Sequence, residues 1–526
     1  MAILTTAGCT RQYPIIPVPV ETKVEEKGRM LLSKETPVFY NESLVNAALF
    51  FQDYCSKKYH IPFEIVMAEN MEKKSGQIRL LLDKTFKKDQ YQMEISAGGI
   101  DIRGSESGVF YGIQSLIQLL PVDTKPRQKK LSVPLIKVSD EPRFTYRGLM
   151  LDVSRHMFPV DFLKKCIDLA AYHKINIFHL HLTDDQGWRV EIKKYPNLNR
   201  IGSWRNGTMI GQYPGTGNDS TRHGGFYTAD EIKDLVEYAR HRYITIVPEI
   251  EMPGHSVAAL ASYPHLGCTG GPYQVKETWG ISDDVYCAGN DSVFVFLEDV
   301  LDEVLEMFPS GYIHIGGDEC PKERWKNCPK CQARIRSENI KDENELQGYF
   351  ISRIENYINL KGRTMIGWNE ILDGELAPDA VIMSWTGDGE KGCLGAAKAK
   401  HHVIMTPSYG FYLDYPQTSK EDSLAANWGG VTTVKAAYLF EPVNSKLASD
   451  EVQYVIGAQA NVWTEYMNNR AKVEYMMFPR LSAISEVLWS PKEARNWDDF
   501  KSRMVKQYQR YKIWGNLYNP AGLDME

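Results

Sequence analysis

Apolar runs alternate with amphipathic segments along the chain after about residue 140. Eight of these runs have the length and composition of buried strands: residues 148–153, 175–182, 244–250, 312–316, 364–368, 381–385, 402–406 and 454–459. Helical periodicity occupies most intervals between them, at residues 160–174, 229–242, 292–308 and 344–361. Thr228, with Glu231 three positions later, forms a capping box for the second of these helices. Apolar strands separated by helices predict an α/β fold, a (β/α)8 TIM barrel.

The chain before residue 140 has a different pattern. Residues 77–85 read as a strand, residues 91–104 as a hairpin, and residues 42–59 and 107–120 as helices. Residues 121–134 are polar and contain proline, which is typical of a connection. We therefore predict three parts: residues 1–15 as a residual export or lipoprotein signal or a disordered start, residues 16–140 as a small α+β domain, and residues 141–526 as the barrel domain with C-terminal helices.

Charge and hydropathy exclude two classes of partner. The net charge is −6, from 61 basic and 67 acidic residues without a long run of either sign, so we expect no nucleic-acid partner. No apolar run approaches the roughly 20 residues that span a bilayer, so no transmembrane segment is expected. The stretch TTAGC, ending at Cys9, is similar to a lipoprotein cleavage box, although Thr6 replaces the usual leucine. We expect an exported protein, periplasmic or lipid-anchored at a bacterial surface.

The nine cysteines form no obvious framework. Cys328 and Cys331 make a C-x-x-C motif, but no second pair follows at the spacing of a zinc ribbon, so no metal site is predicted. Cys268 and Cys287 bracket a glycine-rich loop, and in an exported protein we expect a disulfide between them. Cys320, Cys328 and Cys331 are left unpaired.

Charged and aromatic side chains collect where the predicted barrel strands end. Asp318 and Glu319 follow one strand directly after Gly316 and Gly317, whose backbone freedom lets the strand break into a loop. Solvation of a loop would explain any one such residue, but all but one of the strands end this way. Because the chemistry of TIM barrels lies at the carboxyl ends of the strands, the pattern indicates an active site.

The motifs at these ends carry a family resemblance. HIGGDE occurs together with LDVSRHMF, FHLHLTDDQGWR, PEIEMPGH, IGWNE, SW, YLD and NVWTE, in strand order. From about residue 140 to 490 the chain is similar to glycoside hydrolase family 20 β-N-acetylhexosaminidases, and the α+β domain resembles the usual N-terminal partner of that family. The resemblance implies an exo-acting, retaining hydrolase without a cofactor. Its substrate would be an oligosaccharide or glycoconjugate with a terminal β-linked GlcNAc or GalNAc.

The resemblance also implies roles for particular residues. In this family the acetamido oxygen of the substrate attacks the anomeric carbon and forms an oxazolinium intermediate. Glu319 would be the general acid/base, Asp318 would orient the amide N–H, and Tyr412 would donate to the acetamido oxygen. The implied sugar-binding residues are Trp368, Trp385 and Trp463 as walls, and Arg155, Asp414 and Glu465 for hydroxyls. Behind the acids, the implied positioning residues are Asp184, His255 and Glu251, the last standing where relatives can carry Asp.

Three other functions remain as alternatives. A lacto-N-biosidase would share these motifs with a deeper pocket. A metal-dependent barrel hydrolase is suggested by His179 and His181 on one face of a strand, but no later strand supplies a clean His and Asp set. A non-catalytic sugar-binding protein could dispense with Asp318 or Glu319, and both are present. The spacing of the motifs does not reveal linkage, aglycone or a preference for GlcNAc over GalNAc.

Overall fold

The computed structural model describes residues 13–523, apart from residues 70, 123–128, 375, 377–378 and 420–423. The chain forms two compact units. The first takes in the chain up to Arg143, Tyr172–Lys174 and Ser485–Leu523, and the second takes in Phe144–Ala171 and Ile175–Ile484. The division after Arg143 lies close to the boundary predicted at residue 140, and the C-terminal segment is grouped with the first unit. Cys9, in the predicted signal, lies outside the described residues.

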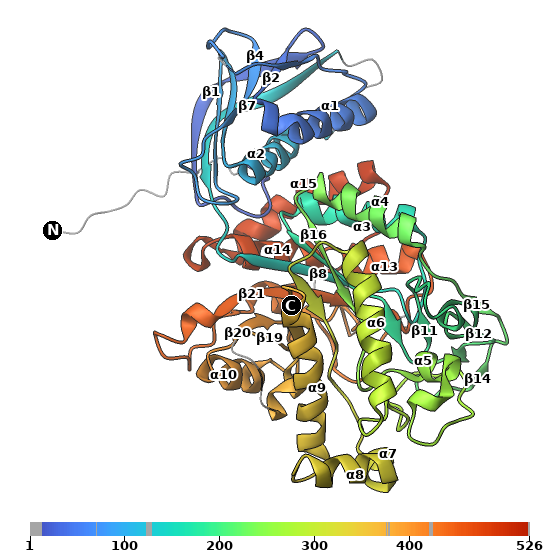
Figure 1. Ribbon diagram of the computed structural model, residues 1–526. Helices are drawn as coiled ribbons and strands as arrows, with labels where there is room; N and C mark the ends of the chain where they lie inside the picture. The colour runs from blue at the N-terminus through green and yellow to red at the C-terminus, as the bar shows by residue number, and fades with distance from the viewer. Residues whose placement is uncertain are drawn as a thin grey trace. The chain divides into compact units, whose positions relative to one another are not determined.

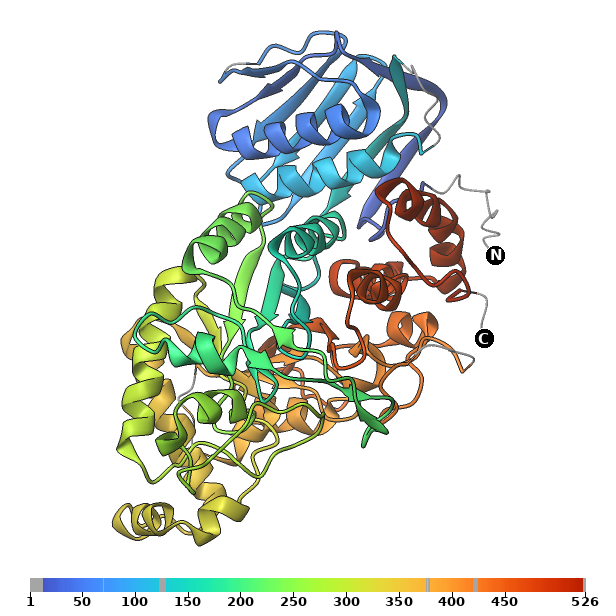
Figure 2. The same ribbon diagram turned by 90° about the vertical axis from the view of Figure 1, so that its right-hand side faces the viewer.

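The first unit is built on a seven-stranded sheet in the order β1-β7-β5-β6-β4-β2-β3. Its strands are β1 (Glu21–Ser33), β2 (Val38–Tyr40), β3 (Ile65–Met67), β4 (Gln77–Leu82), β5 (Tyr91–Ser96), β6 (Gly99–Gly104) and β7 (Lys130–Asp140). Helices α1 (Val45–Tyr59) and α2 (Glu106–Leu119) cover one face of the sheet (Figure 2). The predicted hairpin, strand and two helices are confirmed. This unit also contains α15 (Trp497–Trp514).

The predicted connection at 121–134 is wrong in its second half, because β7 begins at Lys130. Leu131 pairs with Leu32 and Val133 with Met30 in an antiparallel ladder with β1. Leu131 and Val133 are both buried, and they alternate with more exposed residues as in a strand. The strand forms there because β7 pairs with β1, which is far away in the sequence.

The second unit is a closed barrel of parallel strands in the order β16-β17-β18-β19-β20-β21-β8-β9 (Figure 1). Its strands are β8 (Tyr146–Asp152), β9 (Ile177–His181), β16 (Thr245–Glu249), β17 (Tyr312–His314), β18 (Thr364–Trp368), β19 (Val381–Ser384), β20 (His402–Met405) and β21 (Val455–Val462). All eight predicted strands are present, and the TIM barrel is confirmed.

Amphipathic helices connect the barrel strands. The predicted helices are α3 (Val160–Tyr172), α4 (Ala229–Arg240), α6 (Asp291–Met307) and α9 (Glu343–Leu360), and α10 (Glu390–Lys398) and α12 (Val434–Leu439) lie in later connections. Two more helices, α13 (Arg470–Met477) and α14 (Arg480–Trp489), follow the last strand, β21. The capping box of α4 is confirmed, since Thr228 accepts from the Glu231 N–H and the Glu231 carboxylate accepts from the Thr228 N–H. Among the described residues, no helix combines the length and the apolar character that crossing a bilayer requires.

Long loops at the carboxyl ends of the strands carry shorter elements. These are β10 (Thr183–Asp184), β11 (Gly187–Trp188), β12 (Trp204–Arg205), β13 (Met209–Ile210), β14 (Gly217–Asn218), β15 (His223–Gly224), α5 (Val257–Ser262), α7 (Glu323–Asn327) and α8 (Pro329–Ser337). They lie in the connections after β9, β16 and β17.

Candidate active site

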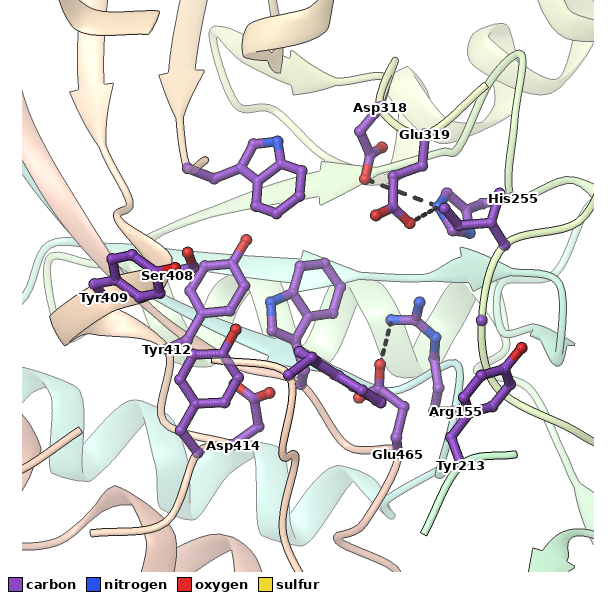
Figure 3. Close-up of a pocket in the computed structure, with 16 residues that line it drawn as sticks. Arg155, Tyr213, His255, Asp318, Glu319, Ser408, Tyr409, Tyr412, Asp414 and Glu465 are labelled. Atoms are coloured by element: carbon purple, nitrogen blue, oxygen red, sulfur yellow. Dashed lines mark ion pairs between the residues drawn. The ribbon is translucent and has the colours of Figure 1, made fainter. Parts of the chain in front are cut away.

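A cavity of about 590 Å³ opens at the carboxyl ends of the barrel strands (Figure 3). This volume lies in the range of about 300–1,000 Å³ that is usual for small-molecule sites. Loops after β8, β9, β16, β17, β19, β20 and β21 all contribute to its lining. The predicted residues that line it are Arg155, His255, Asp318, Glu319, Trp385, Tyr412, Asp414, Trp463 and Glu465.

The loop after β17 turns both adjacent acids toward this cavity. Gly316 and Gly317 have φ values of 72° and 95°, which are left-handed conformations that disfavour other residues. A Cβ on Gly316 would lie 1.7 Å from Oε2 of Glu251, so that carboxyl packs directly against the glycine backbone. Glu319 itself has a φ of 42°. The break that the two glycines predict is therefore present, and the strand ends before the acids.

Asp318 and Glu319 differ in burial and charge. The Asp318 side chain is 14% exposed and that of Glu319 is 34% exposed. Burial, and next the nearby Glu251, raise the pKa of Asp318 well above its usual range. Oδ1 of Asp318 is buried and has no hydrogen-bond partner among the described residues. One acid is thus enclosed with a free acceptor atom, and the other reaches toward solvent.

His255 connects the acid pair to a second carboxylate. Its Nε2 lies 3.5 Å from Oε2 of Glu319 and 3.8 Å from Oδ2 of Asp318 (Figure 3). Its Nδ1 lies 3.3 Å from Oδ1 of Asp184. Burial favours a neutral imidazole, but Asp184, Glu319 and Asp318 together outweigh this effect and raise the pKa of His255 well above its usual range. Burial alone would raise the pKa of Asp184, yet Arg155 and His255 lower it. A charged imidazolium therefore faces both acids.

Arg155 organises the opposite side of the cavity. Its Nη1 lies 3.8 Å from Oε1 of Glu465 (Figure 3). Its Nη2 lies 2.8 Å from Oδ2 of Asp184. Its guanidinium carbon lies 5.1 Å from the centre of the Trp463 ring. Oδ1 of Asp414 and Oε2 of Glu465 are buried without hydrogen-bond partners in the described part of the chain. Fixed donors and free acceptors of this kind suit the hydroxyl groups of a sugar.

Aromatic rings form the walls of the cavity. Tyr412 and Trp385 stack with their ring centres 6.3 Å apart and planes at 14°, and Trp463 lies 6.0 Å from Tyr412. Trp385 is oriented by its Nε1, which donates to Oε2 of Glu370 at 3.0 Å. Trp368 differs from the other two tryptophans, because it is 1% exposed and is not among the lining residues. It belongs to the barrel core against which Trp385 and Trp463 pack.

The barrel interior beneath the cavity holds a buried polar network. Glu249 lies 3.0 Å from Nε2 of His179 and 2.8 Å from Nδ1 of His314, and it accepts from Nε1 of Trp368 at 2.9 Å. Burial would raise the pKa of Glu249, but the imidazoles, His314 first, lower it well below its usual range. His181 similarly lies between Glu251, at 3.2 Å, and Asp152, at 3.3 Å.

These contacts favour core histidines over the metal-hydrolase alternative. His179 and His181 are fully buried, each beside carboxylates of the barrel interior, and neither is among the residues that line the cavity.

Some residues in and behind the cavity were not predicted. Gln186 does not line the cavity but accepts from Nε of Arg155 at 3.2 Å, and its place in the TDDQGW motif is a signal that could have been used. Tyr213, Tyr415 and Trp428 line the cavity, but they come from loops without periodicity. The sequence offered no local signal for these three aromatic residues.

The predicted disulfide is wrong in this structure. Cys268 and Cys287 are both free. Sγ of Cys287 lies 3.6 Å from Sγ of Cys328 and 3.6 Å from Sγ of Cys331, so it does not face a single partner.

Comparisons with known proteins agree on one family. The model of the glycosyl hydrolase family 20 catalytic domain matches residues 144–492, and that of domain 2 of the same family matches residues 12–141. A β-hexosaminidase of Porphyromonas gingivalis is 42% identical over 96% of this chain, which spans 64% of that protein's length. A β-hexosaminidase of Akkermansia muciniphila is 34% identical over 86% of this chain and 90% of the length of that protein.

A solved structure extends the likeness to three dimensions. The exo-β-N-acetylglucosaminidase of Vibrio harveyi, in complex with N-acetylglucosamine, has a TM-score of 0.86 and 32% identity. The match covers 96% of this chain and 78% of that one.

The glycine before the acid pair gives a first prediction. Gly316→Ala should destabilise the protein by more than about 1–2 kcal/mol, the cost of a left-handed backbone in an L-residue, because its Cβ also meets the Glu251 carboxyl. Gly311→Ala, just before β17, is the matched control, since a Cβ there meets nothing within 4 Å. Chemical denaturation of both variants measures the difference. Equal stabilities would contradict the close packing.

Glu251 gives a prediction for pH. Burial and the nearby Glu249 raise its pKa from 4.5 to about 8 in the folded protein. Between these values the folded state holds a proton that the unfolded state has lost, so this contribution to stability decreases as pH rises. Glu251→Gln has no proton to lose, and its Tm relative to the native chain should increase from about pH 5 to about pH 8. Thermal unfolding measures this, and a constant difference would exclude the raised pKa.

Proposed function

The chain belongs to glycosyl hydrolase family 20, and on that premise we propose that it is an exo-acting β-N-acetylhexosaminidase. It removes terminal non-reducing β-linked GlcNAc or GalNAc from oligosaccharides or glycoconjugates, with retention of configuration. The observation that carries this proposal is the unequal burial of two adjacent acids, Asp318 and Glu319, in one cavity. Two equivalent carboxylates flanking a bond would instead suit a double-displacement glycosidase that uses a protein nucleophile.

Glu319 is the proposed general acid and base. It is the more exposed acid, so it can reach the glycosidic oxygen of an aglycone that extends toward solvent. It protonates that oxygen while the bond from the anomeric carbon to it breaks and the acetamido oxygen of the substrate forms a new bond to the same carbon. In the second step Glu319 accepts a proton from water, which attacks the anomeric carbon and restores the acetamide. His255, 3.5 Å away, supplies positive charge beside its anionic form.

Asp318 is proposed to hold the acetamido nitrogen. Its Oδ1, which is buried and has no hydrogen-bond partner among the described residues, would accept the amide N–H. Burial and Glu251 disfavour its anion in the free protein, since they raise its pKa well above the usual range. The positive charge that develops on the oxazolinium ring would stabilise this anion. An interaction that strengthens as the transition state forms accelerates the reaction, whereas uniform binding does not.

The remaining residues position the sugar. Burial raises the pKa of Tyr412 well above its usual range, so its hydroxyl keeps the proton that it donates to the acetamido oxygen. Trp463 packs beneath the sugar ring, and Trp385 walls the acetyl methyl. Arg155, Asp414 and Glu465 bind hydroxyls of the non-reducing end, which makes the enzyme exo-acting. Trp368 supports the sugar-binding walls indirectly, because Trp385 and Trp463 pack against the core cluster that contains it.

The acetamido group supplies the test of this mechanism. An aryl β-N-acetylglucosaminide should be hydrolysed with retention, and the aryl β-glucoside with the same leaving group should be essentially inert, because it lacks the nucleophile. An intramolecular nucleophile can contribute about 7–11 kcal/mol, so the difference in kcat/KM should be many orders of magnitude. A thiazoline analogue of the intermediate should inhibit far more strongly than the product.

Initial rates on the two glycosides, with NMR detection of the first anomer released, make this measurement. Comparable rates on both glycosides, or release of the inverted anomer, would overturn the proposed mechanism. A panel of glycans with GlcNAc or GalNAc termini, run alongside, identifies the sugar and the linkage that the enzyme prefers.

A further inference from the structure

Four cysteine sulphurs converge beside the loops that carry the acid pair. Cys268 follows the turn Pro264–Leu266, and Cys287 lies further along the same loop between β16 and α6. Cys328 and Cys331 stand at the start of α8, after β17. All four Sγ atoms lie within 4.8 Å of one another. Cys287, Cys328 and Cys331 are buried, and Cys268 is half-buried.

The spacing of the sulphurs matches a metal site better than disulfides. The Sγ–Sγ separations are 3.8 Å from Cys268 to Cys331 and 3.6 Å from Cys287 to both Cys328 and Cys331. A disulfide needs an S–S distance of about 2.05 Å. Zinc–sulphur bonds of about 2.3 Å in a tetrahedron place neighbouring sulphurs about 3.8 Å apart. We infer that Cys268, Cys287, Cys328 and Cys331 form a structural site that binds one zinc ion.

The backbone around the cluster is built for this arrangement. Cys328 precedes the first residue of α8, Pro329, and Cys331 lies in the first turn, so the C-x-x-C motif presents both sulphurs from one turn. A Cβ on Gly289 would lie 2.2 Å from the carbonyl carbon of Lys330, which means that the loop after Cys287 packs directly on that turn.

Two further contacts hold the same segments together. Trp325 Nε1 donates to the Tyr286 carbonyl at 2.9 Å, and Arg324 lies 2.7 Å from Asp284. In Figure 1, α7 and α8 form a compact pair at one end of α6 and α9.

The donor set determines the metal and its role. Thiolates select zinc or iron among the common ions, and a tetrahedral set of four cysteines is typical of structural zinc. With every position taken by sulphur, the ion has no open position for water or substrate, so it is not a catalytic metal. Its binding releases the thiol protons and is linked to folding.

A metal ion at this site would hold two loops of the active site together. His255 precedes α5 in the same loop that supplies Cys268 and Cys287, and Glu319 precedes α7 in the loop that supplies Cys328 and Cys331. An ion bound to all four sulphurs therefore joins the loop after β16 to the loop after β17. This inference stands whether or not the proposed glycosidase activity is found.

The experiment uses the full chain, without a metal-binding tag, purified without chelator. Elemental analysis should find one zinc per chain. After unfolding with a chelator and no reductant, a chromogenic thiol reagent should detect all nine cysteines of the sequence. Cys328→Ser combined with Cys331→Ser should lose the zinc and lower the Tm. Cys393→Ser, which changes a buried cysteine outside the cluster, is the matched control and should keep the zinc.

The zinc and thiol measurements on the native chain do not depend on whether the double variant folds. A chain without zinc in which four cysteines react only after reduction would show two disulfides and overturn the inference. Metal-free chain with all thiols reactive, or the absorption spectrum of an iron–thiolate site, would overturn it as well.

Discussion

The chemistry of the pocket depends on which groups replace water around two carboxyls, Glu249 and Asp318. An ionised carboxylate in a protein interior is costly unless cations or hydrogen-bond donors replace its solvent. Glu249 has His179, His314 and Trp368 around it, and its pKa is lowered. Asp318 has His255 at 3.8 Å but also Glu251 nearby, and its pKa is raised. The compensated acid belongs to the scaffold, and in the proposed mechanism the positive charge of the reacting substrate would stabilise the uncompensated one.

This difference is maintained by the barrel floor. The Glu249 network links β9, β16, β17 and β18 beneath the cavity, so the strand ends that carry the loops are fixed with respect to one another. Glu251 lies against Gly316, which brings its carboxyl close enough to influence Asp318. His255 and Asp184 complete the arrangement from the neighbouring loops. The pKa of Asp318 therefore depends on residues of several strands, and substitutions well below the cavity should alter it.

Much of the barrel and its site was predictable, because both depend on local pattern. The eight strands are short apolar runs between amphipathic helices, and nine of the implied site residues line one cavity because parallel strands end on one side. Residues whose partners are distant were not predictable. β7 pairs with β1, Trp368 lies behind the wall it was expected to form, and Cys328 and Cys331 meet two cysteines that precede them in the sequence. Each of these depends on which loops and strands meet when the fold closes.

The division of labour between Asp318 and Glu319 is tested most directly by the dependence of rate on leaving-group pKa in two variants. Glu319→Gln should lose about 10²–10⁴-fold on poor leaving groups and little on activated phenols, giving a steep slope, because acid assistance is missing. The Asp318→Asn variant should lose rate by the same factor on every leaving group, so its slope should stay close to that of the native enzyme. Equal slopes in the two variants would contradict the assignment of separate roles to the buried and the exposed acid.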